Sequence, residues 1–217
     1  MKAFPPKERH GVYRAIASRR GVGSLSATPV PESVLERLLR AAQHGPLPGH
    51  VARWRIIVVR DPKTRQRLCS ALNQRRQSSP SVSDEAPTES IRESPVHLCI
   101  ASVPPQDGVI GKGQDLLQDL FGVCSVVQNL FLATRAEGLG VTWVAMPRAE
   151  SLRPILGIPS SVMPLAYLCL GYPGPTAQTP GREIDLDVRE AIYFDNWGVG
   201  EAGEALLRRL QDRRALE

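Results

Sequence analysis

The stretch of sequence that most constrains the fold reads VQNLFLATRAEGLGVTWV and spans residues 127–144. Its first part is apolar on nearly every side of a helix, interrupted by Gln128 and Asn129, which is typical of a helix buried in a core or in a dimer interface. Gly138 and Gly140 end that helix, and the run 141–146 that follows predicts a strand. The stretch therefore indicates an α+β domain with a long apolar central helix.

Further elements are expected on both sides of this stretch. Apolar spacing predicts helices at about 7–20, 31–44, 64–72, 115–137, 152–156 and 201–216, and strands at 54–60, 96–101, 141–146, 165–172 and 188–194. Such an arrangement predicts a mixed, mostly antiparallel sheet flanked by helices. The segment at about 73–95 is polar and cannot bury enough apolar surface to offset its ordering entropy, so we expect a mobile loop or lid there.

The composition argues against several classes of protein. The chain has 217 residues, and its 27 Lys and Arg against 22 Asp and Glu give a net charge of +5. These cations are scattered among acids and aromatic residues make up only 5%, so we expect no nucleic-acid partner. No run is long enough to span a membrane and the first residues lack a signal core, which predicts a cytoplasmic protein with no membrane partner.

The cysteines and histidines give no sign of a metal site. They lack the paired spacings of metal ligands, so no metal is expected. Each cysteine has apolar neighbours, and we expect buried, reduced thiols at Cys69, Cys99, Cys124 and Cys169.

Several motifs follow one another along the chain in a recognisable order. They are VYRAI with the arginine pair Arg19–Arg20, PVP and LLRAAQH within 29–44, the stretch 127–144, ILGIP and AYLCLGY within 155–172, and NWG at 196–198. In this order the chain resembles the nitroreductase superfamily of flavoproteins, most closely its 5,6-dimethylbenzimidazole synthase (BluB-type) branch. The resemblance covers residues 12–198, which is nearly the whole chain.

The resemblance implies a nitroreductase-like fold and a homodimer that holds two FMN molecules at its interface. It predicts one domain over 1–217, with a core at about 10–198, the polar lid at about 73–95 and a C-terminal helical arm at about 199–217. Both chain termini would form extended arms. The apolar helix of the opening stretch would be the central helix of the dimer.

The resemblance also implies which residues contact FMN. The arginine pair would meet the phosphate, a proline-rich loop would lie beside the isoalloxazine ring, and main-chain groups after the strand at 141–146 would approach the reactive N5 edge. This cofactor-binding set comprises Arg19, Arg20, Gly21, Val22, Gly23, Pro46, Leu47, Pro48, Ala145 and Met146. Two structural alternatives stay open: a solvated helix end at the arginines, and a plain turn that stops the helix at 45–49.

Two positions depart from the branch in a way that bears on mechanism. The Asp that the branch uses in flavin fragmentation is Gly21 here, and its Ser is Ala145. Neither residue can donate or accept a proton, so we do not expect the branch's reaction in its usual form, and the catalytic residues are unassigned. His50, Asp115 and Asp119 are other possible acids that nothing in the sequence singles out. Gly23 replaces an arginine of the branch, which weakens phosphate anchoring.

The leading hypothesis is a divergent flavoprotein, an oxidoreductase that uses FMN or reduced FMN and acts on a small-molecule substrate or on flavin. Its reaction would differ from the oxygen-dependent conversion of FMN to 5,6-dimethylbenzimidazole. One alternative is a catalytically degenerate or cofactor-free dimeric binding protein. Another is a specialised biosynthetic flavoenzyme whose pocket is enlarged at Gly21 and Ala145, and which acts on a small molecule.

Overall fold

A computed structural model describes the chain at residues 2–19, 21–46, 52–78, 88–103, 114–144, 149–175, 177 and 191–193. The residues group into two compact units, one of residues 1–19 with 181–217 and one of residues 20–180. The first unit contains helix α1, Pro6–Ser18. The second unit contains the sheet and every other helix that the structure describes, so it holds the core of the protein.

The described part of the sheet has four strands in the order β1-β2-β4-β3, and each neighbouring pair is antiparallel. The strands are β1 Trp54–Val59, β2 Val96–Ser102, β3 Gly140–Val144 and β4 Met163–Gly171. Every residue of the central strand β2 is buried, because helices cover both faces of the sheet. The expectation of a mostly antiparallel sheet flanked by helices is confirmed.

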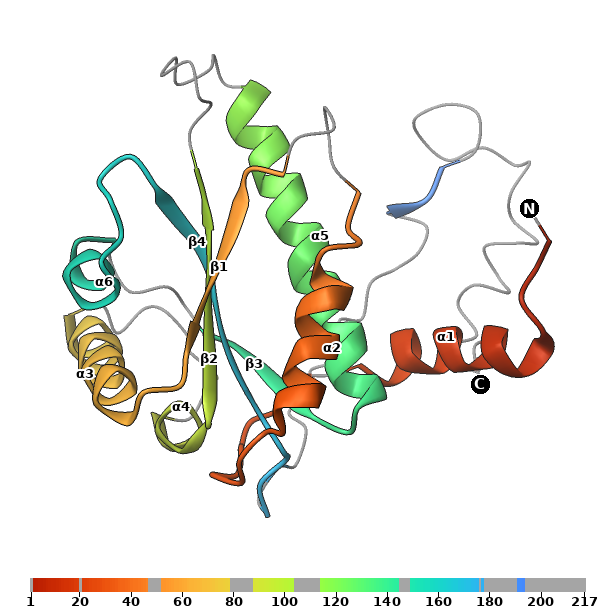
Figure 1. The fold of residues 1–217 in the computed structure, drawn as a ribbon, viewed down its shortest axis with the longest axis horizontal. Helices are drawn as coiled ribbons and strands as arrows, with labels where there is room; N and C mark the ends of the chain where they lie inside the picture. The colour runs from red at the N-terminus through yellow and green to blue at the C-terminus, as the bar shows by residue number, and fades with distance from the viewer. Residues whose placement is uncertain are drawn as a thin grey trace. The chain divides into compact units, whose positions relative to one another are not determined.

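The helices form one layer on each side of the sheet (Figure 1). Helices α2, Glu32–Ala42, and α5, Gln114–Ala136, cover one face. The other face carries α3 Pro62–Ser78, α4 Thr88–Glu93 and α6 Ala149–Leu156. No helix in the described part of the chain is long and apolar enough to cross a membrane.

Successive residues of β2 serve the two layers alternately, as side chains of a strand must. Leu98 and Ile100 pack in the cluster that contains Leu38 of α2. Cys99, between them, packs in the opposite cluster with Leu68 of α3. The continuous apolar run of this strand therefore reflects burial on both faces.

Local sequence signals fix where the helices begin and end. The carboxylate of Asp61 accepts hydrogen bonds from the main-chain N–H of Thr64 at 2.7 Å and from its hydroxyl at 2.7 Å, which caps the start of α3. These bonds hold the pKa of Asp61 below its usual value. After α5, Gly138 adopts a left-handed φ of 72°, and the Leu139 N–H donates to Thr134 O.

The segment expected to be a loop at 73–95 contains more helix than its composition indicates. Helix α3 continues to Ser78 and α4 covers Thr88–Glu93, while residues 79–87 lie outside the described part. Ile91 of α4 is buried, and the Ser94 hydroxyl lies 2.9 Å from Val96 O and 2.7 Å from Leu170 O. One apolar residue and one buried hydroxyl thus anchor a segment whose average composition is polar.

Two other expectations need correction. The edge strand expected at 188–194 is described only at residues 191–193, and these are not in a strand. All four cysteines are free, and three are buried as expected, but Cys124 is exposed. Cys124 lies on the side of α5 that the described residues leave uncovered, whereas the side with Val123 and Val126 faces the core. The helix expected at 201–216 lies outside the described residues.

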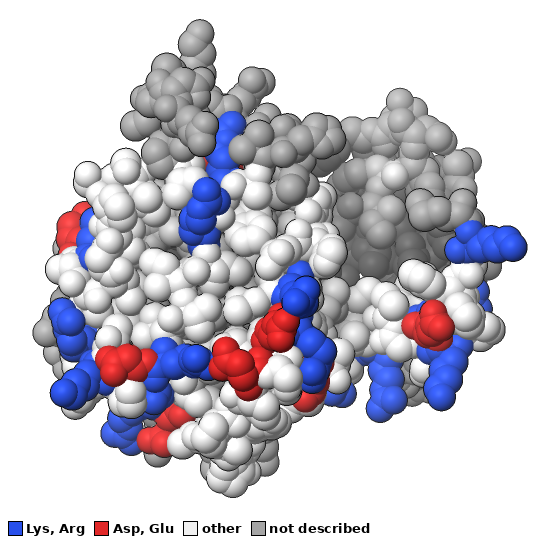
Figure 2. All heavy atoms as spheres, in the orientation of Figure 1, with Lys and Arg blue, Asp and Glu red and all other residues white. Residues whose placement is uncertain are grey.

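Charges of both signs lie side by side on one face of the molecule (Figure 2). Exposed ion pairs include Arg37–Glu137, Arg40–Glu36 and Arg60–Glu32. The Arg37 guanidinium donates to both carboxylate oxygens of Glu137, at 2.7 and 2.8 Å, which joins α2 to the end of α5 and lowers the pKa of Glu137. This face therefore carries mixed charge.

Candidate functional site

The structure describes half of the residues that the sequence places at the flavin. Arg19 is half-buried at the end of α1, where its N–H donates to Ala15 O. The segment 21–23 lies in the second unit, and Pro46 is exposed. The remaining members of the set lie outside the described residues; they are Arg20, Leu47, Pro48, Ala145 and Met146.

The turn Gly21–Gly23 is fastened to strand β3. The N–H of Val22 donates to Val141 O at 3.1 Å, and the hydroxyl of Thr142 donates to Val22 O. Gly140 lacks the Cβ that would lie 2.7 Å from Cγ2 of Val22, so the turn approaches the strand closely. This contact brings the turn next to the strand that leads, one residue after its end, to Ala145.

The turn and the strand offer backbone groups and hydroxyls but no ionisable side chain. Residues 21–26 and 140–144 contain no acid, base or thiol. Trp143 is 52% exposed, and its indole packs against Phe131 of α5 with ring centroids 6.5 Å apart. No ionisable side chain of these two segments is therefore present to transfer a proton.

The loop expected beside the isoalloxazine ring starts from a close contact between α2 and α5. A Cβ on Gly45 would lie 2.9 Å from Cβ of Ser125, so only glycine fits without a shift. The Asn129 side chain donates to Ala41 O at 3.1 Å. That bond gives the amide of Asn129 a partner within the protein, while Gln128 is exposed.

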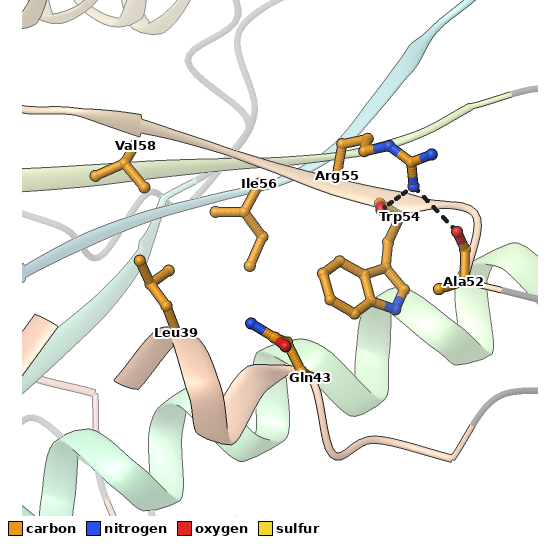
Figure 3. A pocket seen from close by; sticks show the side chains of 7 residues that line it. All are labelled: Leu39, Gln43, Ala52, Trp54, Arg55, Ile56 and Val58. Carbon is orange, nitrogen blue, oxygen red and sulfur yellow. Dashed lines mark hydrogen bonds between the residues drawn. The ribbon is translucent and has the colours of Figure 1, made fainter. Parts of the chain in front are cut away.

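A groove of about 520 Å³ opens between α2 and the outer strand β1 (Figure 3). Its walls are mostly apolar, with one amide, and the lining residues are Leu39, Gln43, Ala52, Trp54, Arg55, Ile56 and Val58. Arg55 donates from Nη1 to Ala52 O at 3.0 Å and to Trp54 O at 2.8 Å, so its charge is turned toward its own backbone. Gln43 and Ala52 flank the loop 45–51 in sequence, which places the groove at the base of that loop.

One of the possible acids named from the sequence has a structural role. The hydroxyl of Ser102 donates to Asp119 Oδ2 at 2.6 Å, and Nε of Arg53 lies 3.9 Å from Oδ1. These two contacts join α5 to the ends of β1 and β2, which is a structural role for Asp119. His50 and the side chain of Asp115 lie outside the described residues.

A buried polar pair that the sequence did not predict lies on the opposite face of the sheet. His97 of β2 and Tyr167 of β4 are fully buried; Nδ1 of His97 lies 2.7 Å from the Tyr167 hydroxyl, and Nε2 lies 2.9 Å from Ile91 O. Because Ile91 O only accepts, Nε2 carries the proton and Nδ1 accepts from Tyr167. Burial is the main cause that lowers the pKa of His97 to about 4, so the ring is neutral.

The surroundings of this pair do not form a metal site. Burial raises the pKa of Cys99 to about 12 and raises that of Cys169, so both thiols are protonated. Among the described residues, no three His, Cys, Asp or Glu side chains are grouped so that they could hold a metal ion. The register of β2 with β4 places His97 opposite Cys169, two residues from Tyr167, and the sequence contains no local signal for this pairing.

The chain is similar in sequence to known proteins over most of its length. The chain is 29% identical over 192 residues to the 5,6-dimethylbenzimidazole synthase of Rhodospirillum rubrum, which covers 83% of this chain and 90% of that protein. It is 28% identical over 191 residues to a putative NADH dehydrogenase/NAD(P)H nitroreductase of Methanothermobacter thermautotrophicus, over 86% of this chain and 87% of that protein.

The fold matches solved structures as well. The NADPH:FMN oxidoreductase of Vibrio harveyi, complexed with NAD⁺, superimposes with a TM-score of 0.70 at 15% identity, over 94% of this chain and 86% of that one. The sequence profile of the nitroreductase family matches residues 16–172, a range that contains the described sheet and the helices on both its faces. The chain therefore belongs to the nitroreductase family.

Proposed function

We propose that the chain is a flavin-dependent oxidoreductase that binds FMN as a homodimer and catalyses a reaction altered from 5,6-dimethylbenzimidazole synthesis. Family membership supports an oxidoreductase, and the Vibrio harveyi structure is named for its use of FMN. The observation that carries the proposal is the turn Gly21–Gly23 fastened to β3 directly before Ala145. Gly21 and Ala145 stand at the two positions where the synthase branch has its Asp and its Ser.

The residues of the turn suit the phosphate end of a flavin. Gly21 is exposed, and a Cβ there would meet no atom within 4 Å. No carboxylate stands at 21–23 to repel a phosphate dianion. In sequence the turn follows Arg19 and Arg20, whose guanidinium groups suit bidentate binding to phosphate.

The chain's own contribution would be binding and orientation. Bound flavin supplies the hydride or electron transfer, and the protein sets its position and environment. We assign phosphate binding to Arg19 and Arg20, orientation of the ring to the loop Pro46–Pro48, and main-chain contacts near the reactive edge to Ala145 and Met146. This reaction needs no acid at the two positions where the synthase branch has Asp and Ser.

The exposed side of α5 is the surface that we assign to the second copy of the chain. Leu117 and Phe121 are 54% and 61% exposed, although both are large and apolar. Cys124 and Gln128 are also exposed, and the four residues follow each other at spacings of four, three and four along one helical face. A twofold dimer in which α5 packs against its counterpart would cover this strip.

The altered reaction can be tested by product analysis. The protein would be incubated with reduced FMN and oxygen, and the mixture separated by chromatography against authentic 5,6-dimethylbenzimidazole. We expect the unmodified chain to oxidise reduced FMN without forming that product, because Gly21 and Ala145 supply no proton. Formation of 5,6-dimethylbenzimidazole by the unmodified chain would contradict the proposal.

The double variant Gly21→Asp with Ala145→Ser is the matched comparison for this assay. A side chain fits at position 21 because the space around a Cβ there is open, so the variant restores the two groups without a clash at that position. Release of product by the double variant alone would show that these two positions account for the difference.

The open space at Gly21 also favours a second candidate, a biosynthetic flavoenzyme that acts on a small molecule larger than the substrates of its relatives. In that case a bulky residue at position 21 would block the substrate and leave flavin binding intact. The test is Gly21→Leu, with flavin affinity and turnover of candidate acceptors measured side by side.

A further inference from the structure

Three main-chain hydrogen bonds hold the segment 22–26, and two of them form one β-bridge. The N–H of Val22 donates to Val141 O at 3.1 Å, and that of Ser26 donates to Tyr172 O at 2.8 Å. Gly174 donates to Ser24 O at 2.9 Å, and Leu25 forms an isolated β-bridge with Pro173. The segment is therefore bound to β3 at Val22 and to the residues that follow β4 at Ser24, Leu25 and Ser26.

A side chain adds to these contacts at the end nearest the proposed flavin pocket. Thr142 of β3 is buried, and its hydroxyl donates to Val22 O across 120 residues of sequence. Both main-chain polar groups of Val22 are thus bound to β3, and its side chain lies over Gly140, where no Cβ intervenes. Residue 22 is fixed on three sides.

We infer that Thr142 is a positioning residue of the proposed flavin pocket, because its hydroxyl clamps the turn that carries Gly21 to the strand that leads into Ala145. This inference rests on the proposed function. The turn and the strand lie side by side and would form one wall of the proposed pocket, and a site is specific only when the residues around it are held in place by supporting hydrogen bonds. The hydrogen bond from the Val22 N–H is a main-chain bond, whereas the bond from the Thr142 hydroxyl can be removed by substitution.

The test compares Thr142→Val, which keeps the shape of the side chain but removes the hydroxyl, with Thr142→Ser, which keeps the hydroxyl. We expect Thr142→Val to weaken FMN affinity about tenfold, as loss of one well-formed hydrogen bond predicts, and Thr142→Ser to restore most of it. Hydrogen exchange of the flavin-free protein should show faster exchange at residues 22–26 in Thr142→Val, with β4 unchanged.

Thr134→Val is the matched control. Thr134 is also buried, and its hydroxyl donates to a main-chain carbonyl, that of Phe131 at 2.9 Å, within α5. It should lower stability by a similar amount without changing FMN affinity or exchange at residues 22–26. Equal FMN affinity in Thr142→Val and the unmodified chain would overturn the inference and leave the proposed function standing. Failure of the unmodified chain to bind FMN would overturn both.

Discussion

Folding strongly lowers the pKa of one buried residue, His97. Its ring is neutral and buried against Tyr167, Ile91 O and the layer that contains Cys169 and Arg65, and its pKa falls from the ordinary 6.5 to about 4. A folded pKa below the unfolded value means that the neutral ring stabilises the protein above about pH 6.5. This stabilisation is lost as the pH falls from 6.5 to about 4.

The loss can be measured as the pH dependence of unfolding. The free energy of unfolding in urea should fall by about 3 kcal/mol more in the unmodified chain than in His97→Gln between pH 6.5 and pH 4. His44→Gln, at an exposed histidine, should behave like the unmodified chain. Parallel curves for the unmodified chain and His97→Gln would show that the ring does not resist protonation.

The sequence indicated which side chains need a hydrogen-bond partner more readily than it indicated which residue that partner is. The polar pair in the apolar helix predicted that Asn129 needs a partner, because an amide cannot be buried unpaired, and it binds Ala41 O. His97 could not be predicted in this way. Its partner is 70 residues away on another strand, and only the register of β2 with β4 brings the two together.

At the scale of elements, the contact between α5 and the turn that follows α2 depends on Gly45. A Cβ at this position would lie 2.9 Å from Cβ of Ser125 and 3.5 Å from its carbonyl carbon. Gly45→Ala should therefore lower the free energy of unfolding by roughly 1–3 kcal/mol, since the turn must move away from α5. Urea unfolding would measure it.

The control for the contact between Gly45 and Ser125 changes Ser125. The double variant Gly45→Ala with Ser125→Gly should recover part of the loss relative to the sum of the single variants, because it removes the atom that the added methyl group would meet. Gly11→Ala in α1, where a Cβ meets nothing within 4 Å, should not destabilise. Strict additivity of the two single variants would contradict the close contact.

Element boundaries were predictable where local signals fix them. The periodic helices α2 and α5 and the strands β1 to β4 lie within a few residues of their expected positions, because apolar spacing and glycine or proline stops are local. The helical part of the segment 73–95 was not predictable from such signals. Its helix α4 depends on Ile91, which is buried in the core, and on the hydrogen bond from Ser94 to Leu170 O. Composition averaged over twenty residues does not show two anchoring side chains.

At the scale of the whole molecule, the exposed strip on α5 predicts how two chains associate. Phe121→Glu places a charge at the centre of the proposed interface and should shift the protein from dimer toward monomer in sedimentation measurements. Met163→Glu, at another exposed apolar residue on β4, should leave the mass unchanged. A Phe121→Glu protein with an unchanged dimer mass would place the interface elsewhere.

The order of motifs was enough to predict the family and its fold, because many weak matches in one order constrain a topology jointly. It was not enough to predict the reaction. Two relatives of nearly equal identity, 29% and 28%, carry different names, a synthase and a putative nitroreductase. Such activities differ through a few residues of the site, and we propose that positions 21 and 145, which are Gly and Ala here, are two of them.

An absorbance titration of the purified protein with FMN tests the central claim most directly. We predict saturable binding of about one FMN per chain, with a shift of the visible flavin bands as the ring leaves water for the pocket. A flavin spectrum that stays identical to that of free FMN at every protein concentration would contradict the account and favour the cofactor-free binding dimer instead.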